Sequence, residues 1–136
     1  MSDTPRIIDH LRDPLADPAA DRSRLRFAAM LVGVGLMHFV APRFFERIVP
    51  RWFPWTRAAV LWSGVAEVTS GALIALPRTR RPGAWLALAT IVAVYPANVQ
   101  MAIDAVRSGS RPQILGTGLR LPMQIPMLVT AHQLTR

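Results

Sequence analysis

Among the polar or ionisable side chains that interrupt the long apolar stretches of this sequence, five could meet inside a helix bundle: His38, Glu67, Asn98, Arg120 and Gln124. An ionisable group facing lipid costs at least about 2.5 kcal/mol, so such residues face the interior of a helix bundle and find partners there. Side chains of these types can hydrogen-bond a polar headgroup whose apolar tail lies between helices. They are therefore the candidate ligand-binding residues of the chain.

Other kinds of chemistry find no support in the sequence. The chain has no cysteine, which excludes a structural disulfide, a Cys-ligated metal centre and a thiol relay of its own. A metal site needs a second strong ligand near His38, and His10 and His132 lie too far away in the sequence pattern. No nucleophile triad, glycine-rich phosphate loop or pair of catalytic carboxylates is present. The sequence identifies no catalytic residue and predicts no covalent cofactor. It leaves open whether the chain takes part in a reaction, and the role it favours is that of an accessory subunit of a quinone-linked oxidoreductase.

The composition favours a membrane protein of one domain. Of the 136 residues, 51% are hydrophobic and 18% are charged, against about 25% charged residues in soluble domains. The mean hydropathy is +0.28 although several stretches are plainly polar, so the apolar residues must be concentrated in blocks.

The positive charge also fits a membrane. The net charge is +8, and all sixteen basic residues are arginines. They lie in short runs between apolar blocks, as do Arg78, Arg80 and Arg81, which is the usual pattern at membrane boundaries. No basic stripe interleaved with aromatic residues appears, so we expect membrane lipids and not nucleic acid as partners.

Four apolar blocks have the length of membrane helices, and strands of that length are not expected. We place the spans at about 25–41, 58–76, 83–103 and 114–134. They predict an all-α domain over residues 25–136, an up-down-up-down four-helix transmembrane bundle. The first block is short for a hydrocarbon core of about 30 Å, so Arg24 and Arg26 are expected to snorkel.

Two polar segments flank the first block. Residues 1–24 form an N-terminal arm, which is either flexible or a short helix on the membrane surface. Residues 42–57 alternate aromatic residues with arginines and suit the headgroup layer between the first two spans. Nine arginines lie on the side of the termini and six on the other side, which favours both termini in the cytoplasm.

The polar residues are expected at similar depths in the membrane and on helix faces that can meet. In such a bundle His38, Asn98 and Arg120 fall in the same half of the membrane, and Glu67 is central. Small and polar residues form stripes that let helices approach closely. These stripes are Gly35 with His38; Ser63, Gly64, Glu67, Ser70 and Gly71; and Gly116, Arg120 and Gln124.

Two interpretations of the cluster remain open. In one, His38, Glu67, Asn98 and Arg120 line a pocket that opens towards residues 42–57 and binds a lipid-soluble headgroup. In the other, an ion pair between Glu67 and Arg120 holds the bundle together, and the amides only join helices. Both interpretations predict that Glu67 and Arg120 are neighbours, because each is the other's only fully charged partner within the spans.

Five short motifs follow one another along the apolar blocks. They are Gly35-Leu-Met-His38-Phe39 with Pro42; Pro54-Trp55; Ser63-Gly64-Val-Ala-Glu67 with Gly71; Tyr95-Pro96-Ala97-Asn98 with Met101; and Arg120-Leu-Pro122-Met-Gln124. In this order they resemble the DoxX-like family of small four-helix membrane proteins, over residues 25–134. The resemblance implies a multi-pass protein of the bacterial plasma membrane.

The resemblance also suggests a function. The family is named for a subunit associated with quinone-linked oxidation, and its relatives are linked to redox-stress complexes or assist other membrane proteins. The resemblance therefore implies the membrane subunit of a redox-linked system that binds a quinone, with a redox protein as partner. The absence of cysteine argues against thiol exchange.

Two alternatives need no quinone. The chain could be a non-catalytic scaffold or assembly factor for other membrane proteins. It could also be a small transporter, which would have to form a homo-oligomer, and a protonatable Glu67 at midspan is the only feature in favour of that role.

Overall fold

The computed structural model describes residues 18–136, so most of the predicted arm of residues 1–24 lies outside the described part. The described part is entirely helical and contains no strand, which confirms the predicted all-α class. The elements are α2 (Pro18–Val40), α3 (Pro42–Glu46), α4 (Thr56–Ala75), the short 3₁₀ helix η2 (Pro77–Thr79), α5 (Arg80–Ser108) and α6 (Arg111–Leu134).

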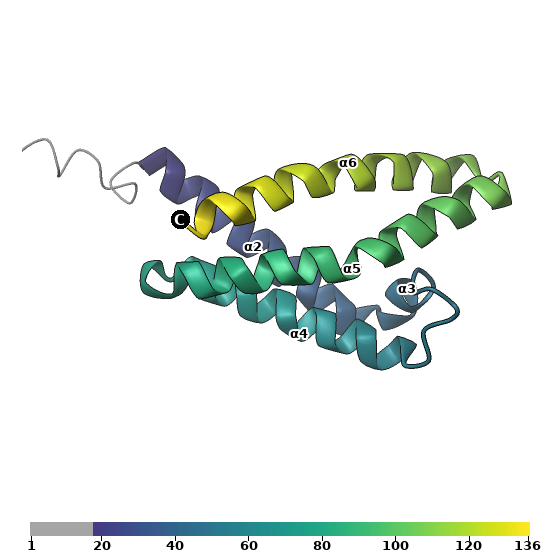
Figure 1. Cartoon of the computed structure of the whole chain (residues 1–136), viewed down its shortest axis with the longest axis horizontal. Coiled ribbons are helices and arrows are strands. Elements are labelled where there is room, and N and C mark those ends of the chain that lie inside the picture. Colours follow the sequence, from purple (N-terminus) through teal and green to yellow (C-terminus); the bar gives the residue numbers. More distant parts are fainter. Residues whose placement is uncertain (1–17) are drawn as a thin grey trace, which may run out of the picture.

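The long helices pack in sequence order. α2 lies against α4, α4 against α5 and α5 against α6, whereas α6 contacts α2 only slightly (Figure 1). α5 and α6 thus form an antiparallel hairpin. The first half of α5 lies along α4, and the turn end of the hairpin diverges from the α2–α4 pair (Figure 1). Within α5, Pro96 removes a backbone donor, and the helix bends about midway along its length (Figure 1).

Three of these helical segments are long and apolar enough to cross a membrane: Pro18–Val40, Thr56–Ala75 and Pro77–Ser108. Their outer surfaces carry exposed large apolar side chains such as Trp62, Trp85 and Val92. α6 has the length of a span but is not among the three, since Arg120 and several glutamines and prolines lower its hydropathy.

A seam of glycines brings the backbones of α2 and α4 together. A Cβ atom added at Gly35 would lie 2.8 Å from the Val68 backbone nitrogen, and one at Gly64 would lie 2.7 Å from the His38 Cβ atom. One at Gly71 would lie 2.7 Å from the Ala28 carbonyl oxygen. The predicted stripe of small residues on α4 therefore does mediate close packing.

The corresponding expectation for α6 is wrong. A Cβ atom at Gly116 would meet nothing within 4 Å, because the hairpin does not bring this part of α6 against another helix closely. The spacing of glycines indicates which face of a helix carries small residues, but it does not indicate whether another helix packs against that face.

Arg24 does not snorkel into the headgroup layer. It is only 5% exposed, and its Nη1 donates hydrogen bonds of 2.6 Å to the carbonyl oxygens of Ile74 and of Ala75 at the C-terminus of α4. Its Nε and Nη2 atoms donate to Asp21 Oδ1 at 3.1 and 2.5 Å. The guanidinium thus caps carbonyls that have no partner within their own helix and carry the negative end of the helix dipole.

We predict that Gly35→Ala lowers the free energy of unfolding by about 1–3 kcal/mol, because the new methyl group would press on backbone atoms of α4. The matched control is Gly33→Ala in the same helix. A Cβ there meets nothing within 4 Å, so stability should stay unchanged or rise by up to about 1 kcal/mol. Titration with a denaturing detergent, followed by circular dichroism, measures both. If the two substitutions changed the free energy of unfolding equally, close packing of α2 against α4 at Gly35 would be disproved.

We also predict that Arg24→Met destabilises the protein by about 2 kcal/mol or more, because two buried carbonyls lose a charged donor. Arg26→Met, at an exposed position two residues away, should change stability by less than about 0.5 kcal/mol. The same titration compares the two variants. A similar loss of stability in both would mean that Arg24 contributes only its positive charge and not its hydrogen bonds to the carbonyls of α4.

Candidate functional site

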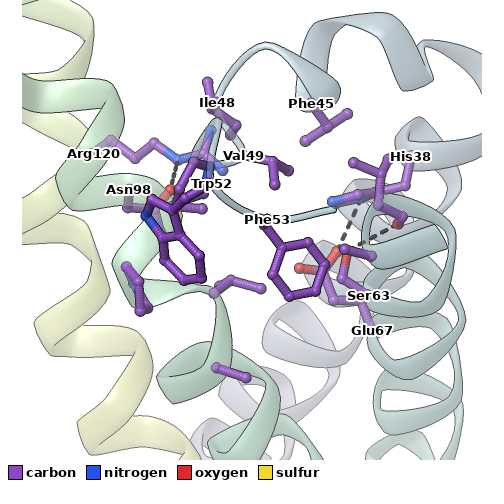
Figure 2. A pocket seen from close by; sticks show the side chains of 17 residues that line it. His38, Phe45, Ile48, Val49, Trp52, Phe53, Ser63, Glu67, Asn98 and Arg120 are labelled. Atoms are coloured by element: carbon purple, nitrogen blue, oxygen red, sulfur yellow. Dashed lines mark hydrogen bonds and ion pairs between the residues drawn. The ribbon is translucent and has the colours of Figure 1, made fainter. Parts of the chain in front are cut away.

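Four of the five predicted binding residues line one pocket of about 210 Å³. His38 comes from α2, Glu67 from α4, Asn98 from α5 and Arg120 from α6. We call this the central pocket. It lies where the bend of α5 at Pro96 separates the hairpin from the α2–α4 pair, and Figure 2 shows two groups of polar side chains facing each other across it.

His38 and Glu67 form one polar wall of the central pocket. Because a carbonyl oxygen only accepts, the His38 Nδ1 atom carries a proton and donates it to Val34 O at 2.9 Å. The Glu67 Oε2 atom lies 3.4 Å from the same nitrogen and is buried without a hydrogen bond. The imidazole also stacks on the Phe45 ring, with centroids 3.7 Å apart. His38 is therefore held rigidly, whereas the Glu67 carboxylate keeps unused accepting capacity.

Arg120 and Asn98 form the other polar wall. Arg120 Nε donates to Asn98 Oδ1 at 3.0 Å, and Asn98 is only 3% exposed. In this arrangement the two terminal nitrogens of the guanidinium and the amide nitrogen of Asn98 are donors without a hydrogen bond in the described part of the chain.

Glu67 and Arg120 line the same pocket and their charges interact, but no direct ion pair joins them. Each has a different nearest partner: Glu67 pairs with His38, and Arg120 with Asn98. The physical reason is the bend of α5, which moves α6 away from α4 and leaves the two charges on facing walls (Figure 2).

Aromatic and apolar residues of the segment between α2 and α4 cover the central pocket. They are Phe45, Ile48, Val49, Pro50, Trp52 and Phe53. Figure 2 shows Trp52 beside the Arg120–Asn98 wall and Phe53 between the two walls. The pocket therefore borders the 42–57 segment as predicted. These covering residues were not among the predicted site residues, although the alternation of aromatic residues and arginines in the segment was visible.

Gln124, the fifth predicted residue, does not line the central pocket. It is buried, and its Oε1 atom has no hydrogen-bond partner. It lies one helical turn beyond Arg120 on α6, on the same face but past the pocket. The described residues also contain no group of three or more His, Cys, Asp or Glu side chains that could hold a metal ion.

A family model described as a domain of unknown function (DUF8561) matches residues 27–135, which include all five predicted site residues. No curated protein matches the chain, and no solved structure matches it.

We predict that the pairing across the central pocket appears in double-mutant cycles. The cycle of Asn98→Ala with Arg120→Gln should give a coupling energy of about 1 kcal/mol or more, because one direct hydrogen bond joins the two side chains. The cycle of Glu67→Gln with Arg120→Gln should give a smaller value, because no hydrogen bond joins those two. Stabilities in detergent micelles provide both energies, and the reverse order would restore the ion pair as the main contact.

Proposed function

We propose that this chain, which belongs to the DUF8561 family, is a membrane protein that binds the headgroup of a lipid-soluble molecule in its central pocket. A quinone is the first candidate, and the protein would then serve as the membrane subunit of a redox-linked system. It encodes no redox centre that we recognise, so electrons would pass through the quinone and a partner protein.

The observation that carries this proposal is the unused hydrogen-bonding capacity on both walls of an otherwise apolar pocket. Glu67 Oε2 offers an acceptor on one wall. The guanidinium of Arg120 and the amide of Asn98 offer donors on the other. Unpaired polar groups in an apolar interior are costly, and a headgroup that reaches both walls would satisfy them.

A quinone-type ring suits this arrangement. It is flat and carries an oxygen atom at each of two opposite ends, so one oxygen can accept from the Arg120 wall. In the reduced form the other end carries a hydroxyl, which can donate to Glu67. Phe53 and Trp52 offer aromatic faces against which such a ring can pack. The isoprenoid tail would lie along the apolar surface between helices.

The proposal includes α6 as the fourth membrane span. Arg120, its one charged residue between the first and last turns, is half-buried, lines the central pocket and bonds to Asn98, which lowers the cost of placing this helix in a membrane. Four spans put both termini on the same side, and we assign that side to the cytoplasm of a bacterial cell, in line with the arginine bias and the DoxX-like motifs.

One observation favours the scaffold alternative. The outer face of α6 exposes large apolar side chains, among them Leu115, Leu119 and Ile125, and α6 contacts α2 only slightly. A face of this kind can pack against another membrane protein as readily as against lipid. In that case the two polar pairs would only specify the arrangement of the helices.

We predict that a short-chain ubiquinone analogue quenches the fluorescence of the purified protein in micelles, because Trp52 lines the central pocket. Glu67→Gln and Arg120→Gln should each weaken the fitted Kd about tenfold, the expected cost of one charged hydrogen bond. Trp52→Phe should remove most of the quenching.

The matched controls are Glu46→Gln and Arg107→Gln, which change the same residue types outside the central pocket and should leave the Kd unchanged. If both pocket variants fold and bind the analogue as the wild-type protein does, the binding site lies elsewhere. If neither folds, the polar pairs are structural and the scaffold alternative gains support.

A further inference from the structure

We propose that a second pocket, at the opposite end of the molecule, binds a phosphate group, supplied in the membrane by an anionic phospholipid. The pocket has a volume of about 240 Å³ and lies between the start of α2, the start of α5 and the end of α6. Figure 1 shows the end of α6 beside the first half of α2. We call it the end pocket. Its lining residues are Ala20, Asp21, Ser23, Arg24, Arg80, Thr130, Gln133 and Leu134.

The end pocket gathers hydrogen-bond donors, of which Arg80 and Thr130 are half-buried and Ser23 and Gln133 are exposed. Arg80, Ser23, Thr130 and Gln133 each line it, and none of their side chains makes a hydrogen bond or ion pair in the described part of the chain. Other helical hydroxyls behave differently: Ser70, Thr90 and Thr117 donate to carbonyls one turn earlier in their own helices. Three helices thus present free donors to one space.

The charge at this end selects an anion. Of the two arginines in the end pocket, Arg24 is already neutralised by Asp21 and held by the carbonyls of α4. Arg80 has no such partner, so the lining carries one uncompensated positive charge. Seven of the described arginines lie at this end, against the single carboxylate of Asp21. They are Arg22, Arg24, Arg26, Arg78, Arg80, Arg81 and Arg136.

A phosphate group matches this donor set better than a carboxylate does. It offers several oxygens around one centre, so it can accept from a guanidinium, two hydroxyls and an amide at the same time. A basic pocket between helices at the cytoplasmic boundary of a membrane is also the place where anionic headgroups bind. The lipid's acyl chains would then follow the apolar surfaces of α2 and α6.

The test compares lipid retention by native mass spectrometry of the full chain in mild detergent, with phosphatidylglycerol added. The full chain matters because residues 1–17, outside the described part, carry four aspartates that can compete for arginines. We expect Arg80→Gln to retain about tenfold less phosphatidylglycerol than the wild-type protein. Arg78→Gln, an exposed arginine two residues away that does not line the end pocket, should retain it fully.

Two further experiments identify the source of the phosphate and keep the test valid if a variant does not fold. Competition by millimolar inorganic phosphate would indicate a site that also takes the free anion, and lack of competition would indicate the lipid alone; both outcomes support a phosphate site. If Arg80→Gln fails to fold, Thr130→Val takes its place, since it removes one donor at nearly constant shape. Equal retention by Arg80→Gln and Arg78→Gln, or undiminished retention by a folded Thr130→Val, would overturn the proposal.

Discussion

The backbones of α2 and α4 approach each other so closely that no side chain larger than hydrogen fits at three positions along their contact, and the other helices are arranged around this pair. At Gly64 the space is taken by the Cβ atom of His38, and Glu67 follows almost one turn later on the same face of α4. The glycine seam therefore places the His38–Glu67 wall of the central pocket. It also aligns Arg24 of α2 with the last carbonyls of α4, where the guanidinium takes the place of absent backbone donors.

The α5–α6 hairpin packs tightly against the α2–α4 pair at one end only. At Gly83 a Cβ atom would lie 2.7 Å from the Leu73 Cβ atom, so the start of α5 is held tightly against α4. Beyond Pro96 the helix bends away, and the second half of α5 carries α6 with it. The space between this part of the hairpin and the α2–α4 pair is the central pocket, which the 45–53 segment covers.

The buried polar groups differ in how completely their hydrogen bonds are satisfied within the described part of the chain. Arg24 uses all three of its nitrogens within the protein, so it is a structural cap. Arg120 uses one nitrogen, and Glu67 keeps an oxygen without a hydrogen bond. Cohesion between helices is available at lower desolvation cost from close glycine contacts of the kind seen at Gly64. The incomplete pairing of Glu67 and Arg120 leaves hydrogen-bonding capacity at the lining of the central pocket.

Residue patterns alone located the four long helices, although α2 begins seven residues before the predicted span and α5 ends five residues after it. Apolar blocks and the prolines and glycines between them predict the helices that became α4 and α6 to within three residues, because length and local breakers decide where a helix begins and ends. Up-down order then puts His38, Asn98 and Arg120 in one half of the protein. Which side chains meet was decided by the tertiary structure, through the rotation of each helix about its axis and the bend at Pro96. The rotation is not local to the chain, and the proline marks a bend without fixing its direction, so the partner of Glu67, the capping role of Arg24 and the position of Gln124 beyond the pocket could not be derived from spacing. Each of them depends on how closely two backbones approach, and that distance is set by packing between segments far apart in the sequence.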